Sequence, residues 1–289
     1  MDVQNTLKFN LLQNAFDYLN CSLEFVIKAK KTGENRSWKF ALINISVAIE
    51  LLLKERLRSE NALLLYNDIN TFKPITRDSK TVSFSTAIER LRFIDDSTLK
   101  NIDRGRLSSA QKLRNQMIHY DVELKIPEAY QEYANLFNFV EEFFICFMKT
   151  NCDVEEYLQQ HINKELWEEE KILNEYFLEE FTCFEGEITH KENKVGVEEA
   201  QEYPKVILKD GTKYDRIRYG DEYLHTPYTY PQDYATHLCH DCLTKKGWFH
   251  LVRCDMEVCP KCKTQLISCG CLPEYNSCEE QEKACLSKD

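Results

Sequence analysis

Two short cysteine motifs near the end of the chain constrain its folding more than any other sequence feature. Cys239 and Cys242 are separated by two residues. After a further sixteen residues, Cys259 and Cys262 repeat this spacing. Each Cys-x-x-Cys turn can direct two thiolates toward one point, and the pattern is typical of zinc sites. Four sulfurs close a tetrahedron around Zn²⁺ and leave no position for a substrate, so we predict one structural zinc ion per chain.

Further histidines and cysteines lie close to these two motifs. The sequence leaves open whether any of them replaces a motif cysteine as a metal ligand, because an ordinary position in a loop explains them equally well. These residues are His237, His240, His250, Cys254, Cys269 and Cys271.

The number and position of the cysteines also bear on the cellular compartment. Nine of the thirteen cysteines lie within the last 51 residues. No apolar run approaches the length of a membrane span, and no secretory signal pattern stands at the beginning. Metal binding explains a cysteine-rich segment in such a chain better than disulfides do. We therefore expect a cytoplasmic protein that does not contact the membrane.

The net charge of −11 comes from one segment of the chain. Residues 1–150 carry a net charge of +2, residues 151–203 carry −12 and residues 204–289 carry −1. The overall acidity is therefore local, and it does not exclude a nucleic-acid partner. The same boundaries predict a helical domain, an acidic helical connector, and a C-terminal domain that combines a β-hairpin, the zinc ribbon and a flexible tail around Cys278 and Cys285.

Apolar residues recur every three to four positions through the first 181 residues, which predicts a mainly α-helical protein. The expected helices cover residues 5–31, 37–53, 83–93, 98–119, 128–149 and 153–181. Glycine is rare and strand-like alternation is absent from the first 150 residues, so we expect a helical bundle there. Residues 206–217 are predicted to form a β-hairpin whose tight turn is Asp210-Gly211.

The helix expected over residues 98–119 ends in a group of polar residues that can carry chemistry. Arg114 and His119 are five residues apart, so they point about 140° apart on an ideal helix. Asn115 is four residues before His119 and lies beside it. His119 stands at the end of the helix, where the helix dipole favours a positive charge, and Tyr120 follows it.

This arrangement, Arg114-Asn115 followed by His119-Tyr120, resembles the signature of the HEPN superfamily. In that family an arginine, often followed by asparagine, precedes a histidine by four to six residues. The helix that contains Glu50-Leu-Leu-Leu-Lys54 is similar to the second helix of the family. The segment that begins at Ser83 is similar to its short helix before the motif helix. The resemblance covers roughly residues 1–150.

The resemblance implies a dimeric, metal-independent endoribonuclease in which two copies of the motif face each other. The catalytic residues that it implies are Arg114, Asn115, His119 and Tyr120. The chemistry is reasonable, because RNA carries its own nucleophile in the ribose hydroxyl. A histidine can take or give that proton, and an arginine can stabilise charge that grows on the phosphate.

We therefore expect an RNA-cleaving homodimer of a prokaryotic toxin or anti-phage defence system, controlled by a protein trigger or inhibitor. Two alternatives remain open. In the first, the chain is a catalytically inactive HEPN protein that binds nucleic acid or regulates a partner. In the second, it is a zinc-ribbon adaptor that dimerises through its helices.

Glu50 and Lys54 form either a surface ion pair or a support for the cleft. Basic and aromatic residues of the zinc-ribbon segment suit nucleic acid, and solvated lysines over a small core explain them equally well: Lys245, Lys246, Trp248, Phe249, Arg253, Lys261 and Lys263.

Overall fold

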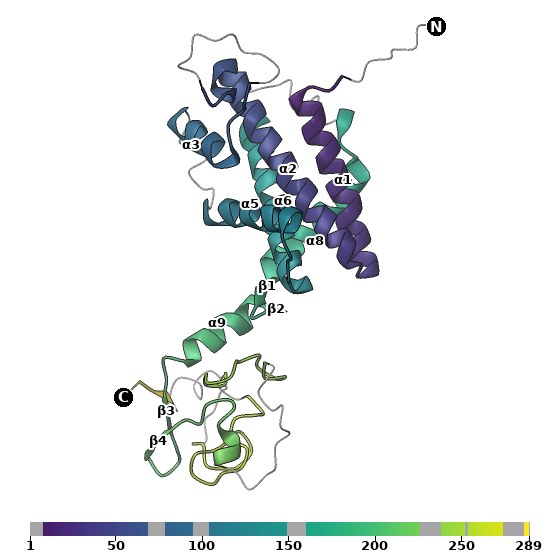
Figure 1. The fold of residues 1–289 in the computed structure, drawn as a ribbon. Coiled ribbons are helices and arrows are strands. Elements are labelled where there is room, and N and C mark those ends of the chain that lie inside the picture. The colour runs from purple at the N-terminus through teal and green to yellow at the C-terminus, as the bar shows by residue number, and fades with distance from the viewer. Residues whose placement is uncertain are drawn as a thin grey trace. The chain divides into compact units, whose positions relative to one another are not determined.

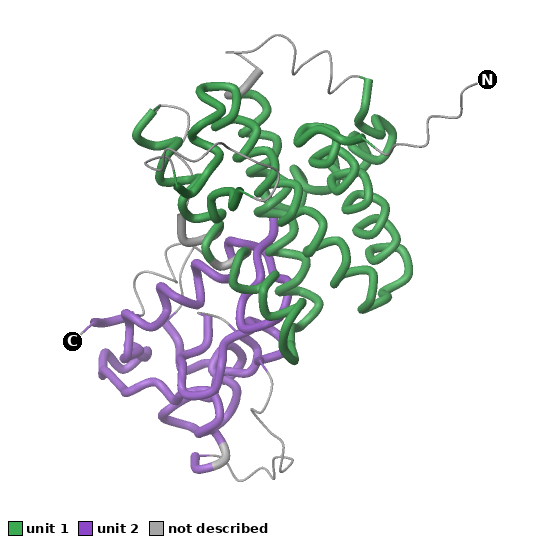
Figure 2. The backbone as a smooth tube through the Cα atoms, turned by 45° about the horizontal axis from the view of Figure 1, so that its top comes forward, with its two compact units in different colours: residues 1–179 green, residues 180–289 purple. Residues whose placement is uncertain are grey.

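The chain divides into two compact units, residues 1–179 and residues 180–289 (Figure 2). The computed structural model describes residues 8–68, 79–94, 104–148, 160–225, 238–251, 254–273 and 286–288. This part of the chain is mainly helical, as predicted, and its small antiparallel sheets lie in the second unit. None of its helices combines the length and apolar character that crossing a membrane requires.

Two long helices, α1 (Leu11–Thr32) and α2 (Asn35–Glu60), pack along each other in the first unit (Figure 1). α1 begins at a capping box in which the side chains of Asn10 and Gln13 each accept a hydrogen bond from the other's backbone N–H. It ends at Gly33, whose φ of +69° is a left-handed conformation that glycine adopts without strain. The two helices bury an apolar seam between them: Leu19, Leu23, Ile45, Ile49, Leu52 and Leu53.

Three more helices complete the bundle: α3 (Phe84–Ile94), α5 (Arg104–His119) and α6 (Ile126–Met148). α5 buries Leu107 and Met117 in the common core. The residues between these two anchors are half-buried or exposed where their side chains are described, so α5 presents its polar residues near the surface. The helices expected over residues 83–93, 98–119 and 128–149 are confirmed within the described residues.

The helix α8 (Lys164–Glu180) also belongs to the first unit. The ring of Phe177 packs against that of Tyr130 of α6 at an angle of 40°, with ring centroids 4.4 Å apart. Glu170 is fully buried and its carboxylate contacts the ammonium of Lys30 at 2.7 Å. These contacts correct the prediction of a separate acidic connector, since the structure divides the chain at Glu180 and not at residues 150 and 203. This charged helix joins the bundle because Leu166 and Trp167 pack against the common core, and its buried carboxylate is paired with a cation.

The second unit begins with a hairpin and a helix that the sequence analysis did not predict. Strand β1 (Phe181–Phe184) pairs with β2 (Glu187–His190), and α9 (Lys191–Ala200) follows directly. Glu185 and Gly186 both have positive φ values, 50° and 85°. This is the conformation of a two-residue type I′ turn, and a glycine at its second position is the sequence signal for it.

A small three-stranded sheet in the order β4-β3-β5 confirms the predicted hairpin. Strand β3 (Lys205–Ile207) pairs with β4 (Lys213–Asp215) across a turn in which Gly211 has a φ of +76°. Strand β5 (Leu286–Ser287) pairs with the other edge of β3. Part of the tail expected to be flexible is therefore in a sheet. Residues 274–285, with Cys278 and Cys285, lie outside the described residues.

Candidate active site and candidate metal centres

Arg114 of α5 is held by an acidic residue from the middle of α2. Its Nη1 donates a hydrogen bond to Oε2 of Glu50 over 3.0 Å, and both side chains are half-buried. The Nε atom of Arg114 is buried and has no hydrogen-bond partner among the described residues. The guanidinium is thus fixed in place by one carboxylate and keeps unused donor capacity.

Glu50 also binds Lys54, one turn further along α2. The ammonium of Lys54 contacts Oε1 of Glu50 at 2.7 Å and Oγ1 of Thr81 at 3.2 Å. Lys54 is buried, so this pair is not the surface ion pair that was one of the two interpretations. The structure favours the other, in which Glu50 and Lys54 support the region that holds Arg114.

The other three motif residues lie at the exposed end of α5. His119 is the last residue of this helix and is exposed, as is Asn115 one turn earlier. No other side chain in the described part of the chain hydrogen-bonds the His119 ring, which remains accessible to a ligand. Tyr120 is 75% exposed and its ring meets that of His119 edge-on, with centroids 6.4 Å apart.

A hollow of about 450 Å³ adjoins this end of α5. Its floor is largely apolar, Arg36 and Lys39 add two cations from the first turns of α2, and Asp121 adds one anion. The volume falls within the range of small-ligand pockets. The lining residues are Asn35, Arg36, Trp38, Lys39, Leu42, Met117, Tyr120, Asp121, Val122, Leu124, Ile126 and Ala129.

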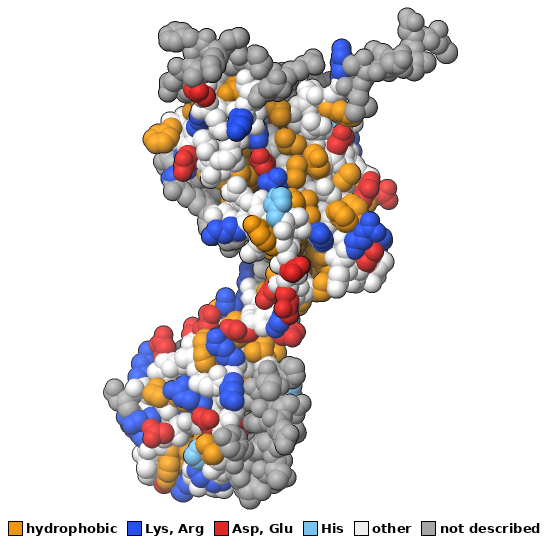
Figure 3. All heavy atoms as spheres, viewed as in Figure 1, with side chains coloured by type: hydrophobic (Ala, Val, Ile, Leu, Met, Phe, Trp, Pro, Cys, Tyr) orange, Lys and Arg blue, Asp and Glu red, His pale blue; other side chains and the backbone are white. Residues whose placement is uncertain are grey.

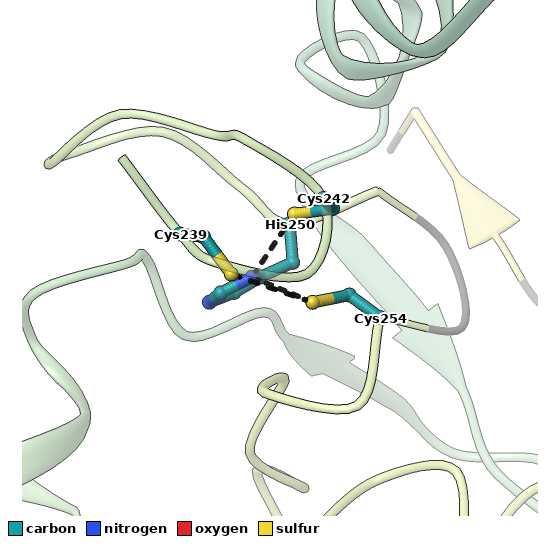
Figure 4. Close-up of side chains that lie close together, drawn as sticks. All are labelled: Cys239, Cys242, His250 and Cys254. Atoms are coloured by element: carbon teal, nitrogen blue, oxygen red, sulfur yellow. Dashed lines mark hydrogen bonds between the residues drawn. The ribbon is translucent and has the colours of Figure 1, made fainter. Parts of the chain in front are cut away.

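Four side chains of the second unit converge in the arrangement that a metal ion requires. Figure 4 shows the sulfur atoms of Cys239, Cys242 and Cys254 around the ring of His250. The Nδ1 atom of His250 lies 3.4 Å from Sγ of Cys242 and 3.2 Å from Sγ of Cys254. All four residues of this first cluster are buried. Three sulfurs and one imidazole nitrogen are a donor set that structural zinc sites use.

A buried carboxylate orients the histidine of the first cluster. Glu222, in the short 3₁₀ helix η2 (Glu222–Leu224), contacts Nε2 of His250 at 2.9 Å, and neither side chain is exposed. This contact directs Nδ1 toward the three sulfurs, as carboxylates do behind histidine ligands of metals. Burial lowers the pKa of His250, but hydrogen bonds to Cys239, Cys242 and Glu222 outweigh it and raise the pKa to about 11. A metal ion bound at Nδ1 of His250 would take the place of the proton on that nitrogen.

The two Cys-x-x-Cys motifs fold into the same backbone turn. In the first, Cys239 N–H donates to the carbonyl of Thr244, and Leu243 has a φ of +61°. In the second, Cys259 N–H donates to the carbonyl of Thr264, and Lys263 has a φ of +65°. The left-handed residue after the second cysteine reverses the chain, so both sulfurs of each motif face the same side.

The second motif belongs to a cluster of its own. Cys259, Cys262, Cys269 and Cys271 place their sulfur atoms within 4.8 Å of one another. The backbone N–H of Cys271 also donates to Sγ of Cys269 over 3.4 Å. Cys259 is buried between this second cluster and the apolar side chains of the β3–β4 region, whereas Cys262 is exposed. Four thiolates form a complete ligand set for a structural metal ion.

The predicted single site made of Cys239, Cys242, Cys259 and Cys262 is therefore corrected. The structure places two of these cysteines in each cluster, and each pair is completed by residues that follow it in the chain. The sequence analysis had named the completing residues only as substitutes: His250, Cys254, Cys269 and Cys271. His240 is exposed and belongs to neither cluster, and His237 lies outside the described residues. The sequence does contain a signal for two sites, because two further ligand candidates follow each Cys-x-x-Cys motif within thirteen residues.

Comparison with known proteins adds no family to this geometry. Family models, curated proteins and solved structures all give no match to the chain. Its function must therefore be inferred from the site at the end of α5 and from the two cysteine clusters.

Proposed function

We propose that the chain is a metal-independent endoribonuclease of the HEPN type. The observation that carries the proposal is the end of α5, where a fixed Arg114 and an accessible His119 stand beside a hollow with two cations. Arginine is suited to phosphate oxygens, and an exposed histidine is suited to proton transfer. This is the functional residue pair that the resemblance to HEPN ribonucleases assigns.

The proposed reaction uses the ribose 2′-hydroxyl of the substrate as the nucleophile. His119 takes the proton of this hydroxyl as its oxygen attacks phosphorus. The bond from phosphorus to the 5′-oxygen breaks, and that oxygen takes up a proton as it leaves. Arg114 stabilises the charge that grows on the phosphate, with Glu50 holding the guanidinium in position. The products carry a 2′,3′-cyclic phosphate and a 5′-hydroxyl, and we expect the hollow to hold a nucleotide beside the cleaved bond.

A homodimer is part of the proposal, because Arg114 and His119 diverge on one helix. A phosphate is clamped more easily by two copies of the motif related by a two-fold axis. The face beside His119 has apolar residues for such a contact, since Ile118 is 47% exposed and Tyr120 is 75% exposed. Figure 3 shows hydrophobic side chains among charged ones on one face of the first unit.

We further propose that each cysteine cluster binds one structural Zn²⁺ ion. The sulfur and nitrogen donors match zinc, and each set of four ligands leaves no coordination position open. Zinc would therefore maintain the fold of the second unit and take no part in RNA cleavage. The second unit also carries lysines near aromatic rings that suit an RNA strand, such as the half-buried Lys245, which lies over Trp248 at 4.4 Å and also contacts Glu185 at 2.6 Å.

The decisive experiment is an RNA cleavage assay in the presence of a chelator, with mapping of the cut ends. His119→Ala should lose about 10²–10⁴-fold in rate, since general acid–base catalysis contributes about that much. Arg114→Ala should lose a comparable amount. His161→Ala is the matched control, because this exposed histidine of the same unit uses its backbone carbonyl to bind Asn20 and that contact survives the change. Equal cleavage by wild type and His119→Ala would refute the proposal.

One observation favours a second candidate function, a nucleic-acid-binding protein without catalysis. Glu50 partly neutralises Arg114, which weakens its electrostatic effect on a phosphate. This candidate predicts that the dimer binds RNA, that binding falls in Arg114→Ala, and that no cut ends form under any condition. Cleavage that depends on His119 selects the ribonuclease.

A further inference from the structure

The two cysteine clusters differ in how far solvent reaches their ligands. In the first cluster the cysteines are at most 3% exposed and His250 is fully buried. In the second cluster only Cys259 is buried; Cys269 and Cys271 are half-buried and Cys262 is exposed. A dissolved oxidant can therefore reach a sulfur of the second cluster directly but must first open the fold to reach the first.

The chemistry of the ligands increases this difference. The second cluster consists of four sulfurs, whereas the first has three and a nitrogen ligand held by Glu222. Thiolates are the nucleophiles of cysteine chemistry, so a site of four sulfurs offers an oxidant more reactive groups than a site of three.

The sulfurs of the second cluster are also close enough to react with one another. All four lie within 4.8 Å of each other, and a disulfide needs a sulfur–sulfur distance of about 2.05 Å. The half-buried Cys269 and Cys271 can close this gap by movement near the surface. Cys259 is held by the surrounding apolar side chains and is the poorer partner.

We propose that the second cluster is an oxidation site for peroxides, at which Cys262 reacts first and the metal ion is released. The Cys262 thiolate attacks the peroxide O–O bond, which gives a sulfenic acid and a hydroxide ion. The thiolate of Cys269 or Cys271 then attacks this sulfur, and a disulfide forms as a second hydroxide leaves. The two thiolates lose two electrons and the peroxide gains them. The proposal rests on the zinc occupancy proposed above and is independent of RNA cleavage.

Loss of the metal ion from the second cluster would also affect the three-stranded sheet of the second unit. The N–H of Lys209 donates to the carbonyl of Cys271 over 2.8 Å, just after β3. Val206 and Leu208 pack in the same apolar group as Cys259. Oxidation should therefore loosen the β3–β4 hairpin while the first cluster keeps its ion.

The test treats zinc-loaded protein with hydrogen peroxide and follows zinc release with a chromogenic chelator. Zinc is counted first and should be two ions per chain, one for each cluster. We expect one ion to leave quickly and the other to stay, and mass spectrometry should find a disulfide that contains Cys262. The Cys21→Ser variant removes an exposed thiol of α1 outside both clusters and should behave as wild type. A Cys262→Ser variant that still holds its zinc should release it more slowly.

Each other outcome overturns some part of the proposal. Release of both ions together, release from the first cluster first, or a disulfide without Cys262 contradicts the oxidation site. Oxidation of Cys21 while both ions stay bound contradicts it as well. A starting content below two zinc ions removes its premise, and it does so without bearing on whether His119→Ala cleaves RNA. Disulfide mapping uses the wild-type chain, so it gives a result even if Cys262→Ser does not fold.

Discussion

The two units of this chain acquire stability by different means. The first unit buries a continuous apolar core supplied by α1, α2, α3, α5 and α6. The second unit has strands of two to four residues, and its two apolar groups contain the cysteines of the clusters themselves. A small unit with so little apolar surface to bury generally depends on disulfides or metal ions. The comparison teaches that the cysteines of the two clusters form part of the core of the second unit.

Metal removal should give the largest effect and should separate the two units. Structural zinc contributes about 10–16 kcal/mol in small domains, so chelation should unfold the second unit. The helical signal in far-ultraviolet circular dichroism should remain, because no ligand of either cluster lies in the first unit. The cuts that limited proteolysis gains on chelation should then lie beyond residue 180. Collapse of the helical signal on chelation would show that the units are not independent.

A cavity in the core of the first unit should have the opposite effect: it should destabilise the first unit and leave the second unit unchanged. Phe137 is fully buried and lies 4.8 Å from the ring of Trp167. Phe137→Ala should lower the free energy of unfolding of the first unit by about 3–5 kcal/mol, since large-to-small core changes usually do. Zinc content should not change. Urea unfolding followed by circular dichroism measures the first quantity and elemental analysis the second, and a loss of zinc in this variant would break the comparison.

Replacement of the carboxylate behind His250 should have a smaller effect that is confined to one cluster. Glu222→Gln keeps the shape of the side chain and removes its charge, so the ring is oriented less firmly. Zinc affinity of the first cluster should fall about 10–100-fold, as it does when such outer partners are lost. Competition with a chelator measures it. The Glu202→Gln change alters an exposed carboxylate that pairs with Lys288 and should leave both affinities as they are.

The smallest effect concerns pH and the first unit alone. Burial raises the pKa of Glu141 to about 7 from its usual 4.5, against the opposing charge of Lys171. Between these two values the folded unit binds more protons than the unfolded chain, so its stability falls as pH rises. The full shift corresponds to about 3 kcal/mol, and solvent screening should leave on the order of 1 kcal/mol. Glu141→Gln should flatten the slope between pH 4.5 and pH 7 in urea unfolding. An unchanged slope would assign it to other groups, such as the buried Glu170.

The helices were predictable because their apolar spacing is a local property. Residues such as Leu19, Leu23, Ile45 and Ile49 recur at helical intervals and are the residues that the bundle buries. The β1–β2 hairpin was missed because each strand has only four residues and lies between helical stretches. Its turn residues, Glu185 and Gly186, were the available signal.

The spacing of the ligand candidates allows two sites but does not by itself establish how the ligands are divided between them. Two Cys-x-x-Cys motifs fit one shared site or two separate sites, and only the path of the chain decides between them. That path depends on contacts such as Glu222 with His250, which are 28 residues apart. The support of Arg114 by Glu50 joins residues 64 positions apart and is equally hidden. Sequence patterns identify ligand types and helix faces, and long-range contacts determine which of them meet.

The ligands of the two clusters follow one another along the chain without interleaving. The first set closes a loop from Cys239 to Cys254, and the second set closes a loop from Cys259 to Cys271. The entropy lost on closing a loop grows with its length, and both loops are short. Each ion can thus be captured by its own loop as soon as that loop has left the ribosome. Assembly of the module can proceed from the first loop to the second, with no stage at which one ion must wait for ligands from the other.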